Sequence, residues 1–293
     1  MAMHGGYALE SVPGGGPRER RLTLDGGAIP LRLVLVGAER VSEAWQNAEI
    51  QTSFWRFYQA DAAGVSLSWA GGTMDYPVTG VICVPGWIRF RFHWRRRVLH
   101  RYIHAEPTAW PRTLVQSHFP APFLIPDRSL GDDLRALTTC MSDPDAWAPE
   151  LALTAQAIAC RGLALALAKL PRDQRPRLQP ADGNRFASVL AHIEAALDRA
   201  LGVPVLAVIA GMQPQPFIRA FRRAYGTTPM QFIIERRIAR ACRLLIDSGM
   251  GIDAVASACG FPNRQYLTRM FSRAMGISPA KYRQRPAGDV LAR

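Results

Sequence analysis

The sequence predicts an α+β protein in which a β-rich N-terminal part precedes an all-helical C-terminal domain. Short stretches of β-branched and aromatic residues, separated by glycine and proline, run from Leu31 to about Ile125. From Ser129 onward, apolar residues recur at three- and four-residue spacings, which is typical of helices. Two similar segments follow one another within the last third of the chain, which indicates a duplicated unit.

These changes of pattern divide the chain into five segments. Residues 1–20 contain three consecutive glycines and a charge cluster, so we expect a flexible N-terminus. Residues 21–128 form the expected β-rich domain, and residues 129–170 add helices to it. The proline-rich, charged stretch 171–183 has no periodicity and is the expected linker to a second domain, residues 184–293.

The clearest strand signal lies in Trp87–Arg95, where apolar and basic residues alternate. One face is apolar and consists of Ile88, Phe90, Phe92 and Trp94. The other face consists of Arg89, Arg91, His93 and Arg95. Several such short strands favour a small β-barrel or a sandwich, with helices trailing it, over a βαβ arrangement. The basic face is a candidate site for an anionic effector, although a solvated strand face has the same pattern.

A second polar group follows, because an extended strand places His100, Tyr102, His104 and Glu106 on one face. Such a face can hold a metal ion, but hydrogen-bonded or solvated histidines give the same pattern, and we expect no metal and no cofactor. We count His100, Tyr102 and His104 with the basic strand face as candidate ligand-binding residues.

Ala146–Leu170 predicts one long, alanine-rich helix whose polar interruptions argue against a membrane span. Its apolar stripe comprises Leu151, Ala155, Ile158, Gly162 and Leu165. This stripe predicts either a homodimer contact or a cover for the open side of the β domain. The five scattered cysteines match no metal or disulfide pattern, which indicates reduced thiols and a cytoplasmic protein.

The net charge of +13 is concentrated at the C-terminus. Residues 184–293 carry +10 and residues 1–183 carry +3, while the hydrophobic content of 48% is ordinary for a soluble protein. A basic domain on a nearly neutral remainder indicates a polyanionic partner, although a solubilising surface gives the same charge.

The internal repeat has two copies, at about residues 203–226 and 252–276, which differ by one inserted residue in the turn. Each joins a short apolar segment ending in glycine to a longer amphipathic segment. The short segments are Val203–Gly211 and Ile252–Gly260, and the long ones are Phe217–Phe232 and Leu267–Tyr282. This order predicts two helix-turn-helix units.

The segment between the copies predicts a single long helix. Thr228 and Gln231 form a capping box around Pro229, and Gly249 provides a stop. An apolar stripe follows the helix at Ile234, Ile238, Ala241 and Leu245. Roughly 20 residues span about 30 Å, and one turn of B-DNA is about 34 Å, so the two units can enter successive major grooves.

The second copy, IDAVASACGF followed by LTRMFSRAMGISPAKYR, resembles the AraC/XylS family of bacterial transcription regulators, and the resemblance covers about Phe186–Arg285. It implies a seven-helix DNA-binding domain, often attached to an effector or dimerisation domain with a cupin-like β-barrel followed by helices. The implied protein is no enzyme: it binds specific double-stranded DNA sequences, responds to a small effector, and contacts RNA polymerase if it activates transcription.

The resemblance also implies positions that face DNA. In the second unit these are Arg264, Gln265, Thr268 and Arg269, and in the first unit Gln215, Ile218 and Arg219. Arginine and glutamine suit guanine and adenine respectively, although an arginine can contact phosphate alone. The first unit departs from the family because Pro214 and Pro216 remove N–H donors from the start of its helix. We therefore expect less base readout there.

Two other functions fit parts of the pattern. One is an architectural DNA-binding protein without a ligand, and the other is an enzyme-like β domain fused to a DNA-binding tail. The sequence contains no nucleophile motif, glycine-rich phosphate loop or metal signature. A closed pocket with paired acid and base residues in the β domain would favour the enzyme.

Overall fold

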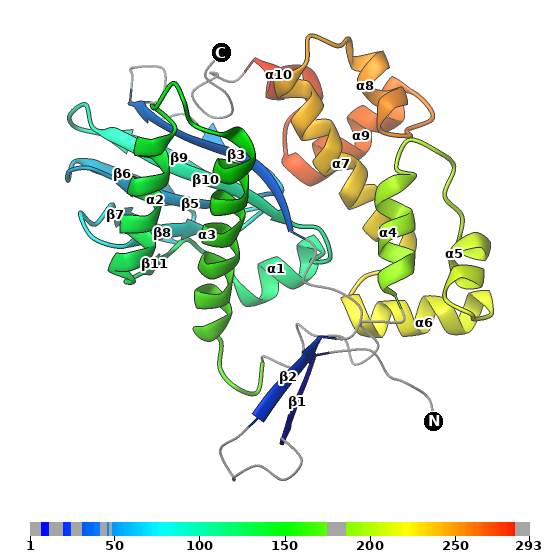
Figure 1. The fold of residues 1–293 in the computed structure, drawn as a ribbon. Helices are drawn as coiled ribbons and strands as arrows, with labels where there is room; N and C mark the ends of the chain where they lie inside the picture. Colours follow the sequence, from blue (N-terminus) through cyan, green and yellow to red (C-terminus); the bar gives the residue numbers. More distant parts are fainter. Residues whose placement is uncertain are drawn as a thin grey trace.

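The computed structural model describes residues 7–11, 20–24, 31–41, 46, 49–174 and 186–284. Strands dominate up to residue 125, and every element after residue 126 is a helix. Figure 1 shows the strands of residues 31–125 and the helices of residues 112–168 on one side of the molecule and the helices of residues 187–283 on the other, with the hairpin of residues 7–24 below them. The predicted order of a β-rich and a helical domain is therefore confirmed.

Two antiparallel sheets form the N-terminal domain, and a separate hairpin pairs β1 (Tyr7–Ser11) with β2 (Arg20–Leu24). The first sheet has the order β11 (Phe123–Ile125), β8 (Val81–Val84), β5 (Trp55–Ala60), β10 (Leu99–Pro107), β3 (Leu31–Arg40). The second has the order β4 (Glu49–Ile50), β9 (Phe90–Trp94), β6 (Val65–Trp69), β7 (Gly72–Asp75).

The two sheets face each other across one apolar core. Tyr58 and Ile82 of the first sheet belong to the same buried cluster as Leu67 and Phe92 of the second. No strand pair in the described part of the chain joins the two sheets, so the domain is a sandwich, and the closed barrel that we predicted is not observed. The alternation predicted for β9 is confirmed, because Phe90 and Phe92 are buried and Arg91 is exposed.

Helices cover the outer face of the first sheet. They are α1 (Arg112–His118), α2 (Arg128–Cys140) and α3 (Ala148–Ala168). The contact of α3 with the sheet is close, since a Cβ at Gly162 would lie 2.6 Å from Cε1 of Phe57. Ala155 and Ile158 are buried on the same side. The predicted stripe therefore covers the β domain, which is one of the two roles that the sequence left open, and its buried residues are not accessible to a second copy.

By length and composition alone, α3 is the one described helix that is apolar enough to cross a membrane, and 33% of its most apolar stretch is buried. Its exposed side also carries Arg161, which forms ion pairs with Asp127 and Asp133 at 3.1 and 2.8 Å. Helix α3 thus packs against the sheet on one side and carries a paired charge on the other. These are features of a helix within a folded domain rather than of a membrane span, as the sequence predicted.

Seven helices fill residues 186–284. They are α4 (Ala187–Ala195), α5 (Val203–Ile209), α6 (Pro214–Tyr225), α7 (Pro229–Asp247), α8 (Ile252–Ala258), α9 (Arg264–Met275) and α10 (Pro279–Arg283). An aromatic-rich core joins α4, α5 and α6 to the start of α7. The core of α8–α10 and the end of α7 continues into the helix-covered face of the β domain.

Three local predictions need correction or lie outside the described residues. The expected flexible N-terminus contains strand β1, because Tyr7–Ser11 pairs with Arg20–Leu24. Helix α1 lies within the stretch that we predicted as strands. Of the expected linker, the structure describes only the turn 171–174.

Candidate nucleic-acid interface

The two repeat copies fold as the predicted helix-turn-helix units. In each, a glycine with left-handed backbone ends the first helix: Gly211 between α5 and α6 has φ 64°, and Gly260 between α8 and α9 has φ 72°. At Gly260 a side chain is also sterically excluded, because a Cβ would lie 2.2 Å from the carbonyl oxygen of Leu197. Glycine supplies this conformation without strain, which explains why both copies have it at the same place.

The second helices of the two units begin differently. Asn263 caps α9, and its side-chain oxygen accepts a hydrogen bond from the backbone N–H of Tyr266 at 2.8 Å. The corresponding residue before α6 is Gln213, whose side chain makes no capping bond, and α6 starts directly with Pro214. The start of α6 therefore offers fewer polar groups than the start of α9.

Helix α9 presents the residues that the sequence predicted for DNA contact. Leu267 and Phe271 are fully buried, while Arg264, Gln265 and Arg269 are exposed and Thr268 is half-buried. Arg264 lies 3.5 Å from Asp253 of α8, in an ion pair that is exposed to solvent. The Arg269 guanidinium lies 5.0 Å from the centroid of the Tyr266 ring, which directs it along the surface of the helix.

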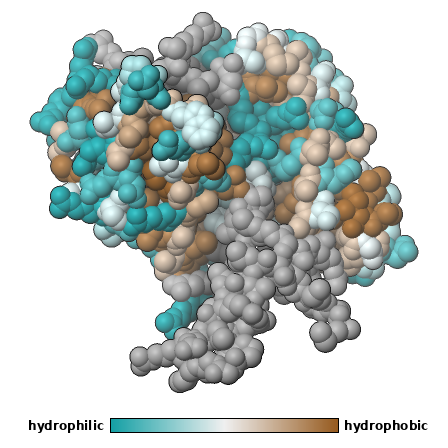
Figure 2. All heavy atoms as spheres, in the orientation of Figure 1, coloured by the Kyte–Doolittle hydropathy of each residue, from teal (hydrophilic) through white to brown (hydrophobic). Residues whose placement is uncertain are grey.

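In the first unit, Gln215 and Arg219 are exposed on α6 and Ile218 is half-buried. Phe217 and Phe221 anchor this helix in the aromatic core. The preceding helix is unusually apolar at its surface, since Val205 is 52% and Val208 77% exposed. Figure 2 shows apolar side chains gathered over α5. This unit therefore exposes fewer polar contacts than the second.

Helix α7 sets the separation of the units. The predicted capping box is present, with Gln231 N–H donating to Thr228 Oγ1 and Thr228 N–H donating to Gln231 Oε1, both at 3.3 Å. Its 19 residues span about 28 Å. Phe232 belongs to the core of the first unit and Ile238 to that of the second, so one rigid helix connects them.

The β domain contacts α7 through a buried network of ion pairs, which the sequence did not predict. Glu106, the partner of Arg32 in the β10–β3 register, lies 3.1 Å from Arg236 and 2.8 Å from Arg243. Arg236 also lies 2.5 Å from Glu194 of α4. Burial alone would raise the pKa of Glu106, but the charges of Arg236, Arg243 and Arg32 outweigh it and lower that pKa to about 2.

The β domain also holds the C-terminal end of α9. The Arg89 Nη2 donates to the carbonyl oxygen of Met275, and the Arg112 Nη1 to that of Ala274, each at 2.9 Å. Both carbonyls belong to the last turn of the helix, where acceptors lack intrahelical partners and positive charge is favourable. Two arginines of the first domain thus fix the helix of the second unit that carries the candidate DNA contacts.

The candidate ligand-binding residues separate into two groups. On the outer face of β9, Arg91 pairs with Glu49 at 3.2 Å, the His93 ring shares a 2.6 Å hydrogen bond with Ser68, and Arg95 is exposed. The other group lies between the sheets, where the rings of His100, Tyr102 and His104 stack in succession. Burial lowers the pKa of His100 to about 3, so that ring is neutral.

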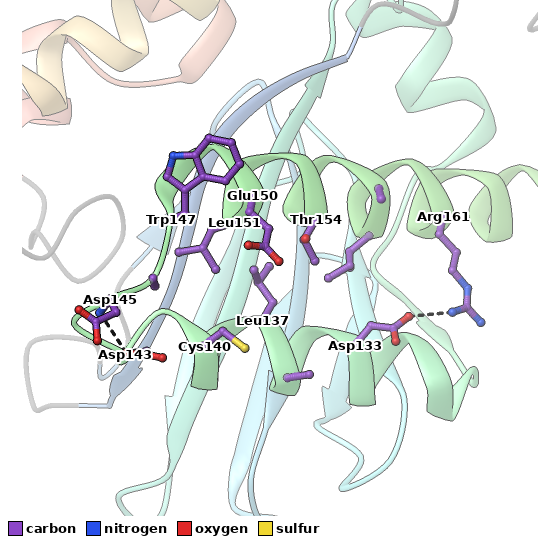
Figure 3. A pocket seen from close by; sticks show the side chains of 14 residues that line it. Asp133, Leu137, Cys140, Asp143, Asp145, Trp147, Glu150, Leu151, Thr154 and Arg161 are labelled. Atoms are coloured by element: carbon purple, nitrogen blue, oxygen red, sulfur yellow. Dashed lines mark hydrogen bonds and ion pairs between the residues drawn. The ribbon is translucent and has the colours of Figure 1, made fainter.

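A groove of about 680 Å³ lies between α2 and α3. Figure 3 shows Leu137, Leu151 and Glu150 beside it, with the ion pair between Asp133 and Arg161 at one end and Trp147 at the other. The indole of Trp147 is 67% exposed. This groove lies between the two helices and is open to solvent, and its lining includes the buried residues Leu137 and Ile158.

Comparisons with known proteins agree with the geometry of the helical domain. The family described as "Helix-turn-helix domain" matches residues 206–285. The MmsAB operon regulatory protein of Pseudomonas aeruginosa is 33% identical over 95 residues, which are 32% of this chain and 31% of that protein. The transcriptional regulator ExsA of the same organism is 38% identical over 74 residues, 25% of this chain and 27% of that protein. The chain thus spans about a third of the length of these curated relatives.

One solved structure extends the likeness to both domains. The structure of ToxT from Vibrio cholerae matches with a TM-score of 0.52 at 11% identity, covering 86% of this chain and 98% of that chain. At this identity the match concerns the fold alone. It shows that a β-rich domain followed by a double helix-turn-helix domain is an arrangement found in a solved protein.

Proposed function

We propose that the protein is a sequence-specific DNA-binding regulator of transcription of the AraC/XylS type, because residues 206–285 match a helix-turn-helix family and its relatives are transcription regulators. The observation that carries this proposal is the pair of units held by α7, each exposing polar residues on its second helix. The proposed DNA contacts are Gln215, Ile218, Arg219, Arg264, Gln265, Thr268 and Arg269.

Of the two units, we assign most of the base readout to α9. Its capped start leaves Gln265 and Arg269 exposed on a helix that the β domain fixes at its other end. Arginine and glutamine suit the edges of guanine and adenine in the major groove. Helix α6 starts with proline, has no side-chain cap and follows an apolar helix, so we assign it the smaller share of the DNA contacts.

The test is selection of duplex DNA from a random pool by the full chain. We expect an enriched motif with two parts about one helical turn apart, one better defined than the other, because one monomer carries two units. Binding should also weaken steeply with added salt, because the protein displaces counterions from the DNA and their release is less favourable at a higher salt concentration. Binding without any enriched motif would instead support the architectural alternative.

The N-terminal domain acts, in this proposal, as the part that responds to a small effector. Its contacts with α7 and with the end of α9 give a physical route by which a change in the β domain alters the placement of both units. If the protein activates transcription, RNA polymerase is the further partner. We expect it in the cytoplasm with the DNA that it binds.

We also propose a homodimer formed through the solvent side of α3 rather than through the stripe that the sequence suggested. Leu153 is 72% exposed there, and the small side chains Ala157, Cys160 and Ala164 continue the exposed face at helical spacing. The groove beside this face offers space for side chains of a second copy. Two copies would place four units on DNA and favour repeated sites.

A further inference from the structure

Arg56 is a charged side chain enclosed in the sandwich. It lies on β5, the middle strand of the five-stranded sheet, and is 1% exposed. Its neighbours Trp55 and Phe57 pack toward the helices, so Arg56 turns to the space between the sheets. There its guanidinium carbon lies 4.6 Å from the Phe54 ring centroid and 5.5 Å from that of Phe90.

The guanidinium has no anionic partner within the part of the chain that the structure describes. Its Nε and Nη2 atoms are buried without a hydrogen bond. Two carboxylates of the same sheet, on β10 and β3, are engaged elsewhere: Glu106 binds arginines of α7, and Glu39 accepts a hydrogen bond from Tyr102. Arginine stays protonated in proteins, so a buried guanidinium without a counter-charge is strongly unfavourable. The two aromatic faces compensate only a small part of this cost.

His104 lies directly beside Arg56, as its partner in the register of β10 and β5. Both of its ring nitrogens are buried without a partner among the described residues, and the ring stacks on Phe54 at 5.2 Å. Burial, the Arg56 charge and His100 lower the pKa of His104 well below its usual value. The ring is therefore a neutral imidazole with one N–H to donate.

We propose that Arg56 and His104 bind the carboxylate of a small organic acid whose apolar body lies against Phe54, Tyr58 and Phe90. This assignment rests on the proposed regulator and names the chemical class of its effector. One guanidinium and one neutral N–H match a single negative charge, because a dianion such as phosphate would bring a second buried charge without a partner. The planar guanidinium suits the two oxygens of a carboxylate.

The test uses the full chain with benzoate and hexanoate as probes and benzamide and hexanamide as neutral controls, at constant ionic strength. Binding is measured by calorimetry and by the midpoint of thermal unfolding. We expect at least one acid to bind and raise the midpoint, while its amide does neither. Arg56→Met should weaken that binding at least about thirtyfold. Arg97→Met, which removes an exposed arginine of the same domain outside both groups of candidate ligand-binding residues, should leave it unchanged.

The stability of Arg56→Met without a probe provides a second, independent readout. Removing an uncompensated buried charge should raise the unfolding midpoint, whereas removing an arginine that is paired within the protein should lower it. A lower midpoint or an unfolded variant overturns the proposal, and so does equal binding of acids and amides or no response to either acid. DNA binding by the same preparations separates the proposed DNA-binding function from the proposed carboxylate site. If the protein binds DNA but responds to neither acid, only the carboxylate site is rejected.

Discussion

The carboxylate of Glu106 lies 3.1 Å from Nη1 of Arg236, and this contact joins the end of strand β10 to the helix that links the two helix-turn-helix units. Both side chains are almost fully buried. Two buried charges are tolerated only with good geometry and further partners, which Arg243, Arg32 and Glu194 supply here. The orientation of α7 relative to the β domain thus depends on one charged cluster.

Replacing this carboxylate should be costly. Glu106→Gln leaves Arg236 and Arg243 buried with only Glu194 nearby, so we expect the free energy of unfolding to fall by about 3–5 kcal/mol. Chemical denaturation of the full chain measures this. Asp132→Asn is the matched control, because Asp132 pairs with Arg135 at the surface, where a pair contributes at most about 1 kcal/mol. An equal effect of the two changes would contradict the assigned role of Glu106.

The same carboxylate predicts a pH dependence. Its pKa is about 2 in the folded protein, below the ordinary value of 4.5, so the folded state holds the ionised form more strongly than the unfolded state does. This contribution to stability is complete above pH 4.5 and is lost as the pH falls from there toward about 2. Urea titrations across this window should show a smaller loss of stability for Glu106→Gln than for the wild type. Parallel curves for the two proteins would contradict this prediction.

Arg269→Ala tests the assignment of base readout to α9. If Arg269 contacts a base, the variant should lose about 1–3 kcal/mol of binding to the selected motif and much less on random DNA. Gln215→Ala on α6 should lose less on the motif, because the first unit has an uncapped, proline-bounded start. Fluorescence anisotropy with both DNAs measures the difference. Equal losses on the two DNAs would make Arg269 a phosphate contact.

The different helix starts predict unequal effects of two cap substitutions. Asn263→Ala removes the bond to Tyr266 N–H and should destabilise the protein by about 1 kcal/mol. Gln213→Asn should change the stability much less, because Pro216 stands in α6 where Tyr266 stands in α9 and has no N–H to donate to such a cap. Thermal unfolding of both variants measures these changes. If Gln213→Asn stabilises the protein as much as Asn263→Ala destabilises it, the new side chain caps α6 through the N–H of Gln215 and this prediction is wrong.

The helical domain was predictable from sequence because its signals are local. Each signal acts on the backbone within a few residues of its own position. These signals are the capping box at Thr228, the glycines at the turns and the apolar spacing along α9. The contacts of Arg89 with Met275 and of Glu106 with Arg236 were not predictable, since each joins residues more than 100 positions apart. The surface that covers the apolar face of α3 also lies far away in the sequence. The spacing of apolar residues therefore showed that one face of α3 is packed, but it did not show whether the β domain or a second copy covers that face.

The exposed face of α3 leads to the last prediction, which concerns the oligomeric state. Ile158 lies on the buried side, so Ile158→Asp should unfold the β domain and give no information about a dimer. Leu153 lies on the solvent side, where an aspartate is compatible with the fold of one copy. We therefore expect the wild type to sediment as a dimer at micromolar concentration and Leu153→Asp as a folded monomer with an unchanged circular dichroism spectrum. Ala152→Asp provides a control at a neighbouring exposed position outside the row of Leu153, Ala157, Cys160 and Ala164. A monomeric wild type, or a Leu153→Asp variant that still dimerises, would remove α3 as the dimer contact.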